Sequence, residues 1–141
     1  MRLRRRGGGD EAVNLVLVAT DRSETAERAV RFAAEMAERY EAELLVLRVL
    51  IGHDGSRAEV VRELEEYVET LVGHRKRSAV VSADDPADGI VEAARRERAD
   101  VLVVGSVGMS GRRQFLLQNV PNRVSHNAPC TVVIVQTHQS G

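Results

Sequence analysis

The sequence has few cysteines, few aromatic residues and no long apolar run, and each shortage excludes a class of protein. A single cysteine, Cys130, excludes a disulfide framework and leaves no Cys-x-x-Cys spacing for a metal or redox site. No apolar run approaches the roughly 18 residues of a membrane span, and no apolar core follows the N-terminal arginines as in a secretion signal. The net charge of −1 argues against a protein that binds nucleic acid by neutralising phosphates. We therefore expect a soluble, cytoplasmic α/β domain that binds neither nucleic acid nor membrane.

The charge is unevenly distributed along the 141 residues. The first ten residues carry four arginines and one aspartate, a balance of +3, so the remaining 131 residues carry −4. Because residues 7–9 are all glycine and the segment has no apolar periodicity, we expect residues 1–12 to be a disordered leader. The expected domain organisation is one folded domain over residues 13–137 and a short tail over 138–141.

In the rest of the chain, short apolar segments alternate with amphipathic ones. The apolar segments predict strands buried on both faces, at residues 15–19, 44–49, 78–82, 101–104 and 131–135. Apolar residues spaced by three and four predict helices between them, near residues 26–40, 60–72, 86–98 and 119–127. Asp21 or Ser23 can cap the first of these helices, and Asp85 with Pro86 opens the third. The alternation predicts a single doubly wound parallel sheet with about five strands and four helices.

Two of the predicted strand ends suit a ligand. In such a sheet, ligands bind beyond the carboxyl ends of the strands, where the strand order reverses. The first strand leads to Asp21, and the fourth leads to a glycine-containing loop over residues 105–113. Glycine lets the backbone approach a phosphate closely, and the following helix N-terminus offers N–H donors. The loop matches neither Gly-x-Gly-x-x-Gly nor the Gly-Lys-Ser/Thr phosphate loop, so a flexible turn without a ligand is the alternative.

Four short motifs, taken in order, resemble the universal stress protein family. They are Val-Ala-Thr-Asp-Arg-Ser-Glu-Thr-Ala at 18–26, Leu-Arg-Val at 47–49, Val-Gly-Ser-Val-Gly at 104–108 and Ala-Pro-Cys-Thr-Val-Val-Ile-Val at 128–135. The resemblance implies a Rossmann-like, adenine nucleotide alpha hydrolase-like sheet of strand order 3-2-1-4-5. It also implies a homodimer, for which the last strand, 131–135, is the expected contact. Members of the family divide into ATP-binding and non-binding types.

The resemblance to the ATP-binding type gives four positions a role. Asp21 and Val49 would flank the adenine and the ribose. Gly105 and Gly108 would lie beneath the ribose and the phosphates. The resemblance therefore implies ATP as the ligand, bound together with Mg²⁺.

The chain departs from the family pattern at the phosphate end of this set. Ten residues after the second glycine, where the family has Gly followed by Ser or Thr, this chain has Gln118 and Asn119, followed by Val120. Gln118 brings a side chain to a place where glycine would let phosphate reach the backbone, whereas Asn119 can still cap the helix. We keep Gln118, Asn119 and Val120 as candidate binding residues and expect a lowered phosphate affinity. Arg112 and Arg113 could compensate with positive charge.

No other residues form a convincing reactive site. The four histidines have no metal-ligand spacing, so no metal site is expected. Ser106 and Ser110 lack a general base in the sequence around them, and Cys130 is expected to be a buried structural thiol. No catalytic residue is assigned, and any ATP hydrolysis should be slow and incidental.

The sequence leaves three functions open. The first is a regulatory stress-response module that binds ATP. The second is a dimeric interaction module that binds no nucleotide, and the third is a regulatory domain of a larger polypeptide. The aromatic residues are few, and none is expected at the adenine site, so backbone and aliphatic contacts near Asp21 and Val49 would have to hold the base.

Overall fold

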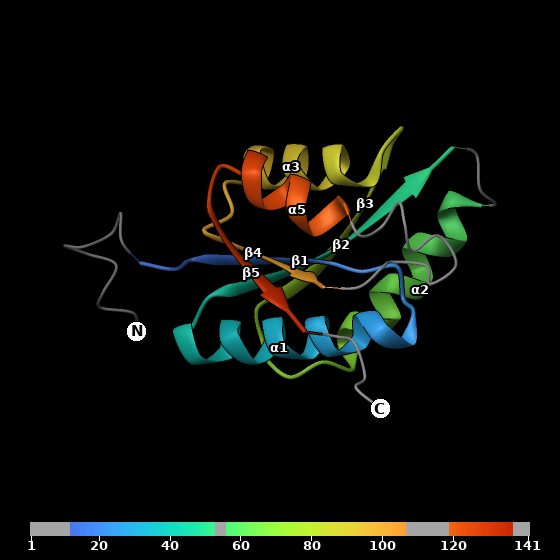
Figure 1. Ribbon diagram of the computed structural model, residues 1–141. Coiled ribbons are helices and arrows are strands. Elements are labelled where there is room, and N and C mark those ends of the chain that lie inside the picture. Colours follow the sequence, from blue (N-terminus) through green and yellow to red (C-terminus); the bar gives the residue numbers. More distant parts are fainter. Residues whose placement is uncertain (1–11, 53–55, 107–118, 137–141) are drawn as a thin grey trace, which may run out of the picture.

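The computed structural model describes residues 12–52, 56–106 and 119–136. The predicted leader up to residue 11 and the predicted tail at 138–141 lie outside these ranges, as do Gly108, Gln118 and the Arg112–Arg113 pair. Strands and helices alternate through the described part (Figure 1). They are β1 (Leu15–Ala19), α1 (Glu24–Tyr40), β2 (Glu43–Ile51), α2 (Arg57–Glu69), β3 (Lys76–Ala83), α3 (Pro86–Glu97), β4 (Val101–Gly105), α5 (Asn119–Asn127) and β5 (Thr131–Val135).

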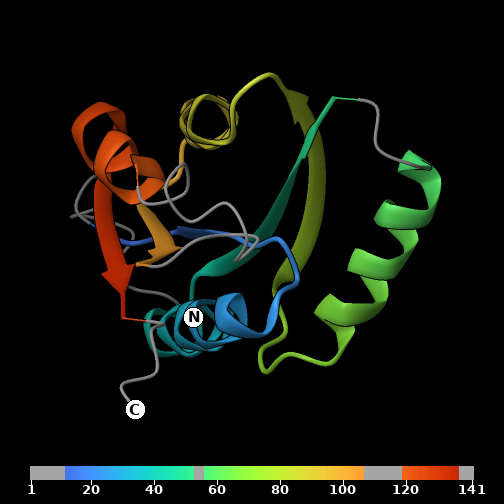
Figure 2. The same cartoon turned by 45° about the vertical axis from the view of Figure 1, so that its right-hand side comes forward.

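The strands form one five-stranded sheet of order β3-β2-β1-β4-β5. Every neighbouring pair is parallel. The helices α1 and α2 cover one face of this sheet, and α3 and α5 cover the other (Figures 1 and 2). The predicted doubly wound parallel sheet and its 3-2-1-4-5 order are confirmed.

The core consists of two apolar layers, one on each face of the sheet. In β1, Val16 and Val18 face α1, whereas Leu15 and Leu17 face α3 and α5. All four side chains are almost fully buried, which explains why the central strands read as unbroken apolar runs. No helix in the described ranges is long and apolar enough to cross a membrane.

Side-chain caps define where the helices begin. Ser23 is the N-cap of α1, because its Oγ accepts a hydrogen bond from the Ala26 N–H at 3.2 Å. Asp85 caps α3, with Pro86 in the first turn as predicted.

The edge strand β3, at the opposite edge of the sheet from β5, is longer than its apolar run. β3 begins at Lys76, two residues before the predicted strand. Lys76 and Arg77 are polar but belong to an edge strand, where charged side chains face solvent. A search for apolar runs therefore misses the beginning of this strand.

Candidate functional site

The strand order reverses between β1 and β4, which are neighbours in the sheet. Val18 of β1 pairs with Val46 of β2 on one side and with Val103 of β4 on the other. The chain leaving β1 enters α1 on one face, and α5, the helix between β4 and β5, lies on the opposite face (Figure 1). Such a reversal leaves room for a ligand at the carboxyl ends of the two strands. Asp21 and Gly105 lie at those two ends.

The turn after β1 fixes the carboxylate of Asp21. Its Oδ1 accepts a hydrogen bond from the Ser23 N–H at 2.9 Å. One residue earlier, Oγ1 of Thr20 accepts from the Arg22 N–H, also at 2.9 Å. The Thr20 N–H itself donates to the Leu47 carbonyl at 2.9 Å, so the turn starts directly from the sheet. Because a carboxylate can accept about four hydrogen bonds, Asp21 can still accept hydrogen bonds from a ligand.

Val49 lies level with Asp21 on the neighbouring strand. Leu47 pairs with Ala19, which places Val49 two residues beyond the end of β1, where Asp21 follows. Val49 is half-buried and packs against the core layer under α3. A Cβ at Gly89 of α3 would lie 2.9 Å from Cγ1 of Val49. The helix therefore holds Val49 in place from one side.

Gly105 and the start of α5 complete the described part of the predicted site. Gly105 ends β4 and pairs with Val135. Asn119 is the first residue of α5, and Val120, only 5% exposed as a residue, lies within the core layer. The side chain of Val120 is therefore not available to a ligand. Gly108 and Gln118 lie outside the described residues.

Arg22, beside Asp21, has an unusual backbone conformation. Its φ is +66°, in the left-handed region that costs a non-glycine residue about 1–2 kcal/mol. The other non-glycine residues with positive φ in the described ranges, Glu41 and Arg98, are helix C-caps, where this conformation is common. Arg22 is not a C-cap, so its conformation needs another explanation.

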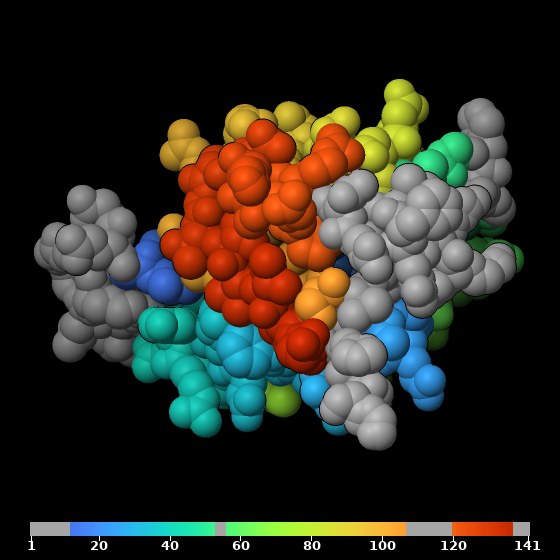
Figure 3. Space-filling model, in the orientation of Figure 1, coloured from blue at the N-terminus to red at the C-terminus, as the bar shows by residue number. Residues whose placement is uncertain are grey.

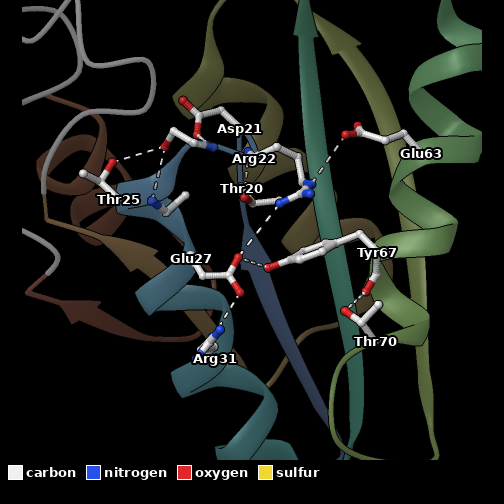
Figure 4. Close-up of polar contacts among 11 residues, drawn as sticks. Thr20, Asp21, Arg22, Thr25, Glu27, Arg31, Glu63, Tyr67 and Thr70 are labelled. Carbon is white, nitrogen blue, oxygen red and sulfur yellow. Dashed lines mark hydrogen bonds and ion pairs between the residues drawn. The ribbon is translucent and has the colours of Figure 1, made fainter.

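The side chain of Arg22 reaches across to α2 (Figure 4). Its Cζ lies 3.6 Å from the centroid of the Tyr67 ring, a cation–π contact. Its Nε lies 3.9 Å from Oε2 of Glu63, and its Nη1 lies 3.9 Å from Oε1 of Glu27 on α1. These side chains together with Arg31 are called the Arg22 cluster below. The cluster joins the turn after β1 to both α1 and α2.

Glu27 is the acceptor at the centre of the Arg22 cluster. Tyr67 donates its hydroxyl to Oε1 of Glu27 at 2.5 Å, and Arg31 donates from Nε to Oε2 at 3.1 Å. Burial raises the pKa of Tyr67, and the hydrogen bond to Glu27 raises it further. Burial alone would raise the pKa of Glu27, but the hydrogen bonds from Tyr67 and Arg31 and the positive charges of Arg31 and Arg22 together outweigh it and lower this pKa. Glu27 is therefore a carboxylate and Tyr67 a neutral phenol near pH 7.

No local pattern in the sequence predicts the Arg22 cluster. Arg22 and Tyr67 lie 45 positions apart, and each has an ordinary local interpretation, Arg22 as a turn residue and Tyr67 as a residue within a predicted helix. Only the packing of α2 beside α1 brings them together. Two signals were available in the sequence: a long cation next to Asp21, and a tyrosine among the few aromatic residues.

The described residues of the candidate site contain no reactive pair. The Ser106 hydroxyl donates to Oε1 of Gln136 at 2.5 Å, and an amide oxygen is not a general base. Cys130 is half-buried against the core, and burial, followed by the charge of Asp100, raises the pKa of its thiol. A raised pKa keeps this cysteine a thiol at neutral pH, which makes it a poor nucleophile.

Known proteins share both the sequence and the fold of this chain. The universal stress protein family model matches residues 13–136. Universal stress protein Rv1636 of Mycobacterium tuberculosis is 33% identical over 143 aligned residues, which cover 89% of this chain and 98% of that protein.

Two solved structures extend the likeness to proteins that hold nucleotides. A universal stress protein in complex with cAMP is 31% identical, with a TM-score of 0.73, covering 90% of this chain and 99% of the other. A universal stress protein of Archaeoglobus fulgidus in complex with dAMP is 26% identical, with a TM-score of 0.64, covering 89% of this chain and 99% of the other. The chain belongs to the universal stress protein family.

Proposed function

We propose that this protein binds an adenine nucleotide at the carboxyl ends of β1 and β4. The observation that carries the proposal is the fixed Asp21 turn beside Gly105, at the point where the strand order reverses. Relatives crystallised with cAMP and dAMP support an adenine nucleotide as the ligand class. In this proposal Asp21 accepts a hydrogen bond from an N–H or O–H of the nucleoside. Val49 provides an apolar contact beside it.

The proposed physiological ligand is ATP together with Mg²⁺, held mainly through its nucleoside. Gly105, Gly108 and the backbone at Asn119 and Val120 would face the ribose and phosphates. Gln118 stands where the family has glycine, so we expect the phosphates to be held less tightly than the nucleoside. The N–H groups at the start of α5, one fewer because Pro121 has none, still favour an anion.

The proposed role is regulatory rather than catalytic. A cytoplasmic stress-response module needs a ligand that reports the state of the cell, and it does not need to convert that ligand. The described residues of the site include a carboxylate and backbone groups but no side chain poised to activate water. Any ATP hydrolysis should therefore be slow.

We further propose that a second copy of the chain pairs with β5. The strand is an edge of the sheet, and its five residues are all β-branched: Thr131, Val132, Val133, Ile134 and Val135. Ile134 is 46% exposed, and Figure 3 shows β5 and α5 on the surface above α1. The opposite edge, β3, begins with Lys76 and Arg77, charges that discourage pairing between edges. An exposed apolar edge of this kind favours association.

The oligomeric state of two lysine variants tests the dimer. Ile134→Lys places a charge on the proposed contact and should convert the dimer to a monomer in sedimentation velocity. Ile51→Lys is the matched control, because Ile51 is 38% exposed but ends β2 rather than β5. A monomeric wild-type protein, or a dimer that survives Ile134→Lys, would contradict the proposal.

Calorimetric titration with ATP and MgCl₂ tests the nucleotide proposal. The wild-type protein should bind ATP, and Asp21→Ala should weaken binding at least about tenfold, the equivalent of one hydrogen bond between a charged group and the ligand. Asp84→Ala is the control, since Asp84 is an exposed carboxylate at the carboxyl end of the edge strand β3. Unchanged affinity in Asp21→Ala would exclude the proposed site.

The alternative is a dimeric interaction module that binds no nucleotide, and Gln118–Asn119 is the feature that favours it. Thermal unfolding separates the two functions, since a ligand at a hundred times its Kd stabilises the folded state by about 2.7 kcal/mol. If millimolar ATP with Mg²⁺ leaves the melting temperature unchanged, the interaction module is the better account.

A further inference from the structure

The turn that carries Asp21 is attached to α2 through the very next residue. We propose that Arg22 is a positioning residue for the nucleotide site, which fixes the Asp21 carboxylate by anchoring the turn to Tyr67 and Glu27. The ligand-binding part of this inference rests on the proposed function. The anchoring part concerns the protein alone and can be tested without a nucleotide.

The backbone of Arg22 supports an anchoring role. A non-glycine residue at φ +66° persists only where its surroundings hold it. The hydrogen bond from the Ser23 N–H to Asp21 spans Arg22 and depends on this conformation, whereas the bond from the Arg22 N–H to Thr20 fixes the turn just before it. The same conformation directs the side chains of Asp21 and Arg22 apart, as Figure 4 shows. Asp21 can therefore face a ligand while Arg22 holds the turn.

The contacts of the guanidinium indicate that it is an anchor rather than a phosphate ligand. It lies against the Tyr67 ring and between two carboxylates, Glu27 and Glu63. Its Nε is buried and makes no hydrogen bond within the described residues. An arginine between two acids is already neutralised, so a nucleotide phosphate gains little by approaching it.

The anchor matters because α2 is the least buried of the three long helices. Only Leu64 and Val68 are buried among its 13 residues, against five buried residues in α1 and six in α3. Arg57 attaches the start of α2 to β3 by donating to the Val80 carbonyl and to Ser82. The Arg22 cluster attaches the same helix to the turn after β1. The Asp21 turn and α2 are therefore joined through side-chain contacts as well as through the sheet.

Amide hydrogen exchange in the nucleotide-free protein tests the anchor directly. Arg22→Met keeps an unbranched side chain of similar length but removes the guanidinium. It should raise the exchange rate of the residue 22 and Ser23 N–H groups about tenfold relative to Val18, as expected from losing one cation–π contact with its charge pairs. Tyr67→Phe, which keeps the ring but not its hydroxyl, should raise the same two rates by a smaller factor, about twofold or more.

Arg77→Ala is the matched control for these exchange rates. Arg77 also bridges two carboxylates, Glu43 at 2.8 Å and Glu97 at 3.0 Å, but it lies at the other end of the sheet. Its loss should leave the exchange rates of residue 22 and Ser23 unchanged relative to Val18. Unchanged rates in both Arg22→Met and Tyr67→Phe would overturn the inference.

A double-mutant cycle tests whether Arg22 acts through Asp21. Arg22→Met should weaken ATP binding about fivefold when Asp21 is present and should have no further effect in the Asp21→Ala background. Equal weakening in both backgrounds would show a general structural role and overturn the positioning inference. If the wild-type protein does not bind ATP, the proposed function fails, and the exchange rates alone decide whether Arg22 anchors the turn.

Discussion

Gly89 of α3 lies against Val49 of β2 so closely that a Cβ at Gly89 would be 2.9 Å from Cγ1 of Val49 and 3.0 Å from Cβ of Ala83. Real Cβ atoms essentially never come within 3.0 Å of another atom, so a larger residue at position 89 requires the Val49 side chain, the strand or the helix to shift. The glycine therefore allows α3 to pack on the strand that carries a proposed adenine contact.

Gly89→Ala should lower the free energy of unfolding by about 1–2 kcal/mol. Overpacking typically costs about 1–3 kcal/mol, and the better helix propensity of alanine returns up to about 1 kcal/mol. Urea unfolding measures the difference, with Glu92→Ala, an exposed position of α3, as a control near zero. Adding Val49→Ala should relieve part of the clash, so the double variant should be more stable than the sum of the two changes predicts. A stabilised Gly89→Ala protein would contradict this packing.

Tyr67→Phe should change how stability depends on pH. The lowered pKa of Glu27 contributes stability above the unfolded-state value, about 4.3, and that contribution is lost as the pH falls through the folded-state pKa. The raised pKa of Tyr67 contributes stability below about pH 10, and that contribution is lost as the pH rises further. Without the hydroxyl, we expect the free energy of unfolding near neutral pH to be about 1 kcal/mol lower. We also expect it to decline less steeply toward acid and toward alkaline pH. Urea unfolding from pH 3 to 11 measures both effects. Parallel curves of stability against pH for the wild-type and Tyr67→Phe proteins would contradict the pairing of Tyr67 with Glu27.

Two aspartates at the start of α3 should differ in their contribution to stability. Asp85 is the N-cap, and its Oδ2 accepts from the Asp88 N–H at 3.1 Å and from Nη1 of Arg123 at 2.8 Å. Asp88 accepts from Nη2 of the same arginine at 3.0 Å, but its side chain is 72% exposed. Asp85→Ala should therefore cost about 1–2 kcal/mol, whereas Asp88→Ala should cost less than about 1 kcal/mol. Equal losses in thermal or urea unfolding would show that the cap contributes nothing of its own.

Restoring the family pattern at Gln118 and Asn119 should strengthen phosphate binding. In the Gln118→Gly, Asn119→Ser double variant, ATP affinity should rise about tenfold, the value of one charge-assisted hydrogen bond to a phosphate. Adenosine, which lacks phosphates, is the matched control, and its affinity should stay within about twofold. An equal gain for both ligands in calorimetry would show that the departure does not act on the phosphates.

The sequence predicted the fold well because the strongest signals are local and repetitive. The fully buried strands β1 and β4 appear as unbroken apolar runs, and Asp85 with Pro86 marks the start of α3. The strand order followed from family resemblance rather than from periodicity. The start of β3 at Lys76 was missed because an edge strand does not need apolar side chains at its ends.

The positions of the candidate site residues were predictable only where they depend on strand ends. Asp21 and Gly105 follow apolar runs, so the sequence could place them at one edge of a parallel sheet. The contact of Arg22 with Tyr67 depends on where α2 packs, which no local pattern encodes. The sequence offers both Asp21 and Ser23 as the cap of α1; in the structure Ser23 takes that role, and Asp21 instead accepts from the Ser23 N–H.

The central claim is that an adenine nucleotide binds at the carboxyl ends of β1 and β4. A titration of the ¹⁵N-labelled protein with ATP and Mg²⁺, followed by amide chemical shifts, tests it most directly. We predict saturable shifts that are largest at residues 21–23, at Val49, at Gly105 and at residues 119–120. The absence of shifts at millimolar ATP, or shifts confined to other parts of the molecule, would contradict the claim.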